Sequence, residues 1–186
     1  MIKNPWDNED LARTLCEGGV AVMPTDTIYG MVGKALDSKV VNRIYEIRSR
    51  APDKPCIILI SAMAEMGNFG IKLTEEQKNI FEKYEEPTSI VVDCDNPDFE
   101  YLHRGTKTLA FRVPRVKELI DLLSKTGPLI APSANIEKFP ASESIEDAHK
   151  YFGDKVDLYV DAGPIVSKAS KIIRLHPDGS TTILRE

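Results

Sequence analysis

The sequence predicts a single α/β domain over residues 1–186, built on a mixed sheet of parallel and antiparallel strands. Apolar runs of strand length alternate with segments of helical period along the chain. Several strand-like runs cluster near the C-terminus, which favours a partly antiparallel sheet. The sequence contains no internal repeat, low-complexity tract or obvious linker, so one domain accounts for its length.

Five segments have the apolar spacing of amphipathic helices. They are residues 9–19, 38–50, 74–84, 117–125 and 144–153. Ser38 stands in an N-cap position before a stripe of valines and isoleucines, and Pro52 follows the end of that helix. Thr74 and Gln77 form the pattern of a capping box. Glycines close the first and the last of these helices, as is common at helix C-termini.

The apolar runs outside these helices predict the strands. They are residues 20–24, 56–61, 89–93, 108–113, 129–135, 157–163, 171–175 and 181–185. The run 56–61 is almost continuously apolar and has the length of a strand. The run 129–135 is expected to begin as a strand and to continue into a loop.

The bulk composition restricts the class of protein. Hydrophobic residues make up 42% of the chain and charged residues 28%, and the formal net charge is -5. This balance argues against a strongly basic nucleic-acid-binding protein, but it is compatible with a local basic pocket. Three widely spaced cysteines and an acidic N-terminus indicate a reducing cytoplasm and no secretory signal. No apolar run approaches the roughly 20 residues of a membrane-spanning helix.

The sequence lacks the standard phosphate-loop, dinucleotide-binding and zinc-protease motifs. Its three histidines, His103, His149 and His176, lie far apart along the chain. This spacing disfavours a histidine-centred active site or a histidine-based metal site.

Two segments leave open a choice between local structure and ligand binding. The segment PTDTIYG, residues 24–30, follows the first predicted strand, where α/β sheets bind ligands, but it also fits a self-capping turn. The segment RSRAPDKP, residues 48–55, holds three cations. They fit a solvated helix terminus, with Glu46 and Arg50 paired four residues apart. They also fit a clamp for a phosphate or carboxylate.

Two further segments place polar side chains among apolar ones. In an extended strand, Thr108 and Arg112 lie on one face. An arginine within an apolar strand either reaches solvent or meets an anion. In the segment APSAN, extended backbone would put three residues on one side: Ala131, Ser133 and Asn135. An ordinary loop with an Asx-type turn is the alternative for this segment.

In this order, the segments PTDTIYG, RSRAPDKP, TLAFRVP and APSAN resemble the YrdC-like family of L-threonylcarbamoyladenylate synthases of the TsaC type. The segments KASKIIRL and ILRE also fit, so the resemblance spans residues 20–185. It implies a twisted, mixed sheet around a large, positively lined, concave cavity. It also implies condensation of L-threonine, bicarbonate and ATP, with Mg²⁺ on the ATP, to threonylcarbamoyl-AMP and pyrophosphate. A threonylcarbamoyl-transferase complex would then modify an adenosine of tRNA.

The resemblance also implies residue roles. The catalytic set would be Arg48, Arg50, Ser133 and Asn135. The ATP-binding set would be Arg50, Lys54, Thr108, Ser133, Ala141 and Arg185. The threonine-binding set would be Thr27, Leu59, Arg112, Ala131 and Ser170. No protein side chain would ligate a metal, and catalysis would rest on orientation and on electrostatic stabilisation of phosphate charge.

The chain also departs from the family pattern. Arg48 stands where the family usually has lysine, Glu86 stands at a glycine position, Met31 replaces leucine, and residues 137–140 read EKFP instead of Ser-Gly-x-Pro. The carboxylate of Glu86 would weaken nucleotide binding if it faced the cavity. These changes leave an alternative: a divergent paralogue that binds tRNA, double-stranded RNA or a nucleotide without turnover. The net charge argues against tight RNA binding.

Overall fold

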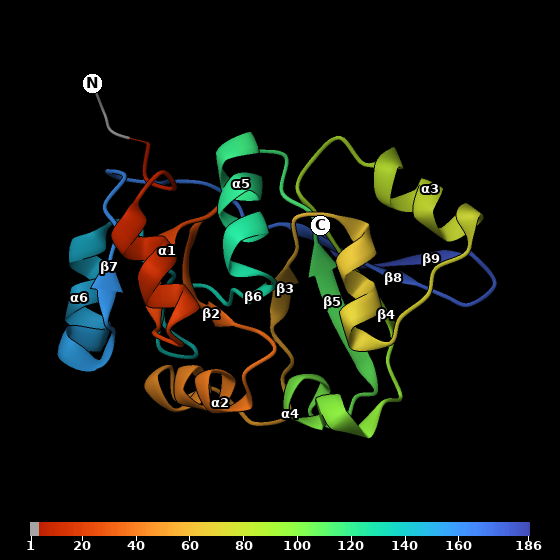
Figure 1. The fold of residues 1–186 in the computed structure, drawn as a ribbon, viewed down its shortest axis with the longest axis horizontal. Helices are drawn as coiled ribbons and strands as arrows, with labels where there is room; N and C mark the ends of the chain where they lie inside the picture. Colours follow the sequence, from red (N-terminus) through yellow and green to blue (C-terminus); the bar gives the residue numbers. More distant parts are fainter. Residues whose placement is uncertain (1–3) are drawn as a thin grey trace.

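Strands from both halves of the chain form one mixed sheet (Figure 1). The structure is a computed structural model that describes residues 4–186, except for the side chains of residues 81 and 82. Within this part the sheet has nine strands. Their spatial order is β7 (Leu158–Tyr159), β1 (Ala21–Pro24), β2 (Tyr29–Lys34), β6 (Leu129–Ile130), β3 (Ile57–Leu59), β5 (Thr108–Arg112), β4 (Thr88–Asp93), β8 (Lys171–Leu175) and β9 (Thr181–Arg185).

The pairing confirms the predicted mixture of parallel and antiparallel strands. The pairs β1–β7, β3–β5 and β4–β8 are parallel, and the other neighbours are antiparallel. Strand β2 was not predicted from the sequence. Its six residues include two glycines, which interrupt the apolar pattern that marks a strand. The segment PTDTIYG therefore has regular structure at both ends. It contains the last residue of β1, the turn of the β1–β2 hairpin and the first residues of β2.

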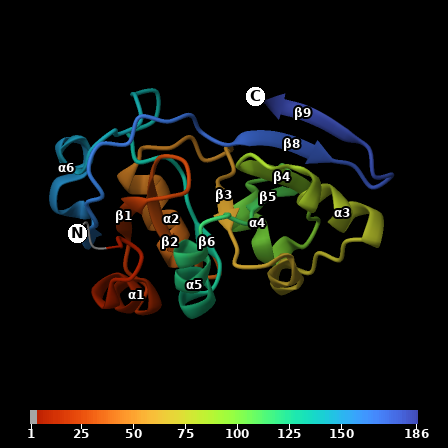
Figure 2. The ribbon, with the colours of Figure 1, turned by 90° about the horizontal axis from the view of Figure 1, so that it is seen from above.

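Helices pack on both faces of the sheet (Figures 1 and 2). They are α1 (Glu9–Cys16), α2 (Ser38–Ile47), α3 (Glu75–Lys83), α4 (Glu100–His103), α5 (Lys117–Thr126) and α6 (Ile145–Phe152), with 3₁₀ helices over Met63–Phe69, Pro97–Phe99 and Gly153–Lys155. α1 and α5 contribute to one core cluster, and α2, α4 and α6 contribute to the other. The short elements at 63–69 and 97–103 were not predicted.

Strand alternation divides the core into these two clusters. In and just before β1, Val20 and Val22 pack with α2 and α6, whereas Ala21 and Met23 pack with α1 and α5. All four side chains are fully buried. At about 1.5–3 kcal/mol for each large buried apolar side chain, such a two-faced core holds the sheet in place without disulfides.

Close packing against β2 positions helix α2. A Cβ at Gly33 would collide with Val40 and lie 3.1 Å from Ile44 Cδ1, so the absent side chain lets the helix approach the strand. The N-cap is Asp37, one residue before the predicted Ser38, and its carboxylate accepts from the backbone N–H of Lys39.

Helix α2 ends at Ile47, three residues earlier than predicted. Ser49 adopts a left-handed φ of 48°, which turns the chain out of the helix. Arg50 therefore does not pair with Glu46. It donates instead to the carbonyl oxygens of Lys54 and Pro55, at 3.0 and 2.8 Å. The predicted pairing of Glu46 with Arg50 is wrong for this reason.

Among residues 4–186, no helix has both the length and the apolar character needed to cross a membrane. Residues 1–3 lie outside the described part. They belong to the N-terminal segment that was expected to lack a secretory signal.

Candidate functional site

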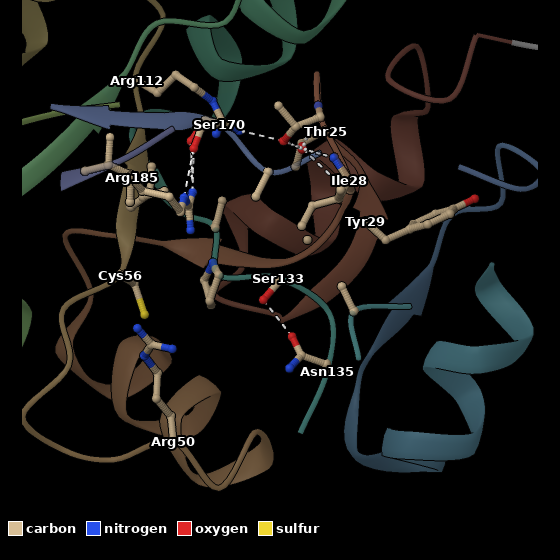
Figure 3. A pocket seen from close by; sticks show the side chains of 18 of the residues that line it. Thr25, Ile28, Tyr29, Arg50, Cys56, Arg112, Ser133, Asn135, Ser170 and Arg185 are labelled. Atoms are coloured by element: carbon tan, nitrogen blue, oxygen red, sulfur yellow. Dashed lines mark hydrogen bonds between the residues drawn. The ribbon is translucent and has the colours of Figure 1, made fainter. Parts of the chain in front are cut away.

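A cavity of about 360 Å³ opens where the β1–β2 hairpin, the end of β5 and the C-terminal strands meet. Thr25 follows β1, Ala131 follows β6, and Arg112 is the last residue of β5. Tyr29 and Ile57, the first residues of β2 and β3, also line it, so the cavity lies where strands of both directions begin and end. Figure 3 shows Arg112 and Arg185 close to Ser170, with Arg50 beside Cys56 farther along the wall.

Three arginines line this cavity: Arg50, Arg112 and Arg185. The Arg185 guanidinium donates to the backbone carbonyl of Ser170, with Nη2 at 2.6 Å, and burial lowers the pKa of Arg185. Backbone carbonyls also hold Arg50, as described above. Neither arginine has a carboxylate partner within the described residues. The wall therefore carries positive charge that the protein leaves available to an anion.

Arg112 lies deeper and has a carboxylate partner that the sequence reasoning missed. Its Nη2 lies 2.8 Å from Asp26 Oδ1, and the two side chains are only 5% and 6% exposed. Nη2 also donates to Thr27 Oγ1 at 3.5 Å, and Nε is buried with no partner among the described groups. Burial lowers the pKa of Arg112, and the charge of Asp26 opposes that shift. The guanidinium thus has donor capacity left over beside the cavity.

The hairpin turn places two threonine hydroxyls beside this arginine. Thr25 Oγ1 and Thr27 Oγ1 lie 3.1 Å apart, and Thr25 Oγ1 donates to the carbonyl of Ile28. A Cβ at Gly30 would lie only 3.0 Å from Thr25 Cγ2. The predicted threonine-side residues Thr27, Arg112, Ala131 and Ser170 all line the cavity.

A polar cluster supports the opposite wall. Arg48 is 1% exposed, and its Nη2 donates to Asn135 Oδ1 at 3.1 Å and to Ser133 Oγ at 3.3 Å. Ser133 Oγ in turn donates to Asn135 Oδ1 at 2.6 Å. Ser133 and Asn135 line the cavity, whereas Arg48 lies behind them. Burial lowers the pKa of Arg48 to about 10. Arg48 therefore orients the Ser-x-Asn segment from inside the fold.

Backbone pairing with β2 brings this segment to the cavity. Met31 N donates to Pro132 O and Ala134 N donates to Tyr29 O, both at 2.9 Å. Gly30 and Ser133 form an isolated β-bridge between the same two segments. The hairpin and the Ser-x-Asn segment are thus held together, although more than 100 residues separate them in the sequence.

Some predicted residues do not line the cavity. Leu59 is fully buried in the core cluster beside α5. Thr108 is the first residue of β5, whereas Arg112 is its last, and the Thr108 hydroxyl lies 3.0 Å from that of Thr106. At about 3.3 Å per residue, four steps along a strand separate Thr108 from Arg112 although they share a face. Glu86 lines a different cavity and pairs with Lys171, so its carboxylate does not face the arginines.

Lys54 is also absent from the cavity wall, because a second carboxylate that the sequence reasoning missed holds it. Its Nζ lies 2.5 Å from Glu137 Oε1, and Glu137 Oε2 accepts from the backbone N–H of Ala51. Residues 137–140 depart from the family pattern Ser-Gly-x-Pro, and the glutamate at position 137 of that departure is the sequence feature that indicates this contact. Among the other predicted residues, Arg50, Ala141 and Arg185 do line the cavity.

Comparison with known proteins identifies the fold. The Sua5/YciO/YrdC sequence family, described as telomere recombination, matches residues 13–186. The chain belongs to this family. This confirms the resemblance inferred from the sequence motifs.

Several members of the Sua5/YciO/YrdC family show how close the likeness is. A threonylcarbamoyl-AMP synthase of Pyrococcus abyssi is 29% identical over 85% of this chain and 47% of its own length. One from Pseudomonas fluorescens is 26% identical over 92% of this chain and 93% of its own length. The chain therefore spans about half of the first relative and nearly all of the second.

Solved structures give the same fold. P. abyssi Sua5 complexed with L-threonine matches with a TM-score of 0.86 at 26% identity, over 98% of this chain and 54% of that one. Escherichia coli YciO matches with a TM-score of 0.79 at 20% identity, over 95% of this chain and 87% of that one, and shows the fold alone. The predicted α/β class is confirmed.

Proposed function

We propose that the protein is an L-threonylcarbamoyladenylate synthase. It condenses L-threonine, bicarbonate and ATP to threonylcarbamoyl-AMP and pyrophosphate. The observation that carries this proposal is the cavity itself, which is lined by a nearly buried arginine beside two threonine hydroxyls and by two further arginines. The names of the relatives support it, and so does the bound L-threonine of the P. abyssi relative.

Arg112 binds the carboxylate of L-threonine in this proposal. A guanidinium with unused donors suits a carboxylate, because the two planar groups can form paired hydrogen bonds. Thr27 and Ser170 lie on the same side and supply hydroxyls for the polar groups of the amino acid. The backbone of Ala131 completes this side of the cavity.

Arg50, Ser133 and Asn135 form the nucleotide side, and Arg185, which donates to Ser170, lies where the two sides meet. Ala141 lies on the loop beside it. The guanidinium groups stabilise negative charge that grows on the phosphates during the reaction. No aspartate or glutamate is among the described residues that line the cavity, so Mg²⁺ would be held by the ATP phosphates rather than by protein carboxylates.

The chemistry needs no protein nucleophile. The threonine amine forms a C–N bond with CO₂ and gives up a proton to water, or it forms that bond with bicarbonate as a C–O bond breaks and water leaves; either route gives a carbamate. A carbamate oxygen then bonds to the α-phosphorus of ATP, the bond to the bridging oxygen breaks, and pyrophosphate leaves. The protein contributes by holding the reacting groups together, which can supply about 7–11 kcal/mol.

The product is reactive, and a threonylcarbamoyl-transferase complex would consume it by transferring the group to an adenosine of tRNA. We place this activity in the cytoplasm, which suits three cysteines that form no disulfide in the described structure. The names of the relatives do not favour the alternative, a paralogue that binds RNA or a nucleotide without turnover.

Pyrophosphate release tests the proposal directly. Purified protein with ATP, Mg²⁺ and bicarbonate should release pyrophosphate only when L-threonine is present. Arg50→Gln should lower the rate by about 10²-fold, because it removes a charge aimed at the phosphates. Arg13→Gln, at an exposed ion pair on α1, is the matched control and should leave the rate unchanged. Equal release with and without threonine would overturn the proposal.

A further inference from the structure

The turn after α2 is built as an anion site, and a carboxylate of the protein occupies it. The Ala51 N–H and the Lys54 ammonium both donate to Glu137, one to each carboxylate oxygen. The Arg50 guanidinium adds to the positive field at this carboxylate. A backbone N–H, an ammonium and a nearby guanidinium are the groups that proteins use to bind phosphate.

Glu137 is less exposed than its partner and is attached to the fold through its backbone. The Glu137 side chain is 13% exposed, whereas that of Lys54 is 55% exposed. The Glu137 backbone N–H donates to Arg48 O at 3.0 Å, which fixes the start of the loop to the end of α2. Lys54 is therefore the member of the pair that solvent reaches, and its ammonium can exchange the carboxylate for another anion at small cost.

The loop that carries Glu137 also forms part of the cavity wall. Asn135 Nδ2 donates to Phe139 O at 2.8 Å, and both residues line the cavity. Lys138, between Glu137 and Phe139, has a φ of 73°, a conformation that glycine adopts more easily. The Glu137 contact thus connects the cavity loop to the cationic turn at residues 50–55.

We propose that Glu137 competes with the nucleotide phosphates for Lys54 and for the Ala51 N–H. ATP gains these donors only by taking them from the Glu137 carboxylate, so Glu137 lowers the affinity of the cavity for polyphosphates. This inference rests on the proposed function, because it takes ATP as the ligand of the cationic wall.

The competition depends on charge and persists at neutral pH. The hydrogen bond from Lys54 and the backbone hydrogen bond from Ala51 lower the pKa of Glu137 to about 2. The carboxylate is therefore ionised wherever ATP carries its full charge. A neutral side chain of the same size, by contrast, cannot compete with a phosphate for an ammonium.

Calorimetric titration of Glu137→Gln with three ligands tests the proposal. ATP and pyrophosphate should each bind about fivefold to twentyfold more tightly than to the wild type, because a charged competitor has been removed. Adenosine, which has no phosphate, should bind equally to both proteins. The matched control is Glu46→Gln, which removes an exposed carboxylate of α2 that makes no ion pair in the described structure, and it should leave all three affinities unchanged.

A double-mutant cycle shows whether the effect passes through Lys54. In a Lys54→Met background, Glu137→Gln should raise ATP affinity by a smaller factor than in the wild-type background, because only the Ala51 N–H remains contested. A role for Glu137 that is only structural predicts weaker binding in both backgrounds. Glu137→Asp keeps the charge and should leave ATP affinity closer to that of the wild type than Glu137→Gln does.

The outcomes separate this inference from the proposed function. Equal or weaker ATP binding by Glu137→Gln overturns the inference and leaves the synthase proposal standing. Tighter pyrophosphate binding without any ATP binding supports the competition and overturns the synthase proposal. Absence of binding of both ATP and pyrophosphate to every variant overturns both.

Discussion

Two ion pairs flank the cavity, and they differ in depth. Asp26 and Arg112 are nearly excluded from water, whereas Lys54 projects into solvent from its contact with Glu137. A buried carboxylate cannot leave its arginine without exposing both charges to a poor solvent, so it acts as a permanent support. An exposed ammonium can exchange partners at small cost. The same pairing chemistry therefore fixes the Arg112 guanidinium in place and leaves the Lys54 ammonium able to exchange partners.

The largest expected effect is a loss of stability on breaking the buried ion pair. Asp26→Asn leaves the Arg112 charge without a carboxylate in the protein interior, and it should lower the free energy of unfolding by about 3 kcal/mol. Urea denaturation of the wild type and the variant measures this loss. Asp93→Asn, at the more exposed pair with Arg174, is the matched control and should lose much less. Equal losses in the two variants would show that burial does not distinguish the pairs.

Changing the buried cation itself should affect substrate binding more than folding. Arg112→Lys keeps a positive charge near Asp26 but loses the paired donors of the guanidinium. We expect the KM for L-threonine to rise about 30-fold to 100-fold, with a much smaller change in the KM for ATP. Steady-state pyrophosphate release at varied threonine and varied ATP separates the two constants. A larger change for ATP would place Arg112 on the nucleotide side.

The smallest effect concerns pH at the outer pair. A free glutamate titrates near about 4.3. Because the pKa of Glu137 is lowered in the folded protein, its stabilising contact is fully present above that ordinary value and is lost as the pH falls through about 2. The Glu137 carboxyl ¹³C shift should therefore stay constant from pH 7 to about pH 4. A midpoint above about 4 would show that Lys54 and Ala51 do not hold the carboxylate in solution.

Local sequence signals predicted most of the elements, because capping residues, glycines and apolar periods act within one element. The helix beginning at Thr74 forms with its predicted capping box. Strand β2 was not predicted because it contains Gly30 and Gly33. Each lacks a side chain, which allows close packing in the fold but also removes the apolar pattern by which a strand is recognised.

The site was predictable only to the level of single residues. An arginine within an apolar strand was expected either to reach solvent or to meet an anion, and Arg112 does meet one, the carboxylate of Asp26. Its partner Asp26 lies 86 positions earlier in the sequence, and no local period connects the two. Glu137 likewise lies 83 positions from Lys54. Such pairs depend on the sheet order, which no one segment of the sequence encodes.

The position of Arg185 ties the cavity to the edge of the sheet. It belongs to β9, an edge strand whose residues are all exposed, although the Arg185 guanidinium itself is partly buried against Ser170. Edge strands open more often than central ones, and their amide hydrogens exchange faster. Each opening of β9 would withdraw a guanidinium from the cavity, so the opening equilibrium of this strand, which hydrogen exchange measures, sets how much of the time the cationic wall is complete. An anion bound at Arg185 should in turn slow that exchange.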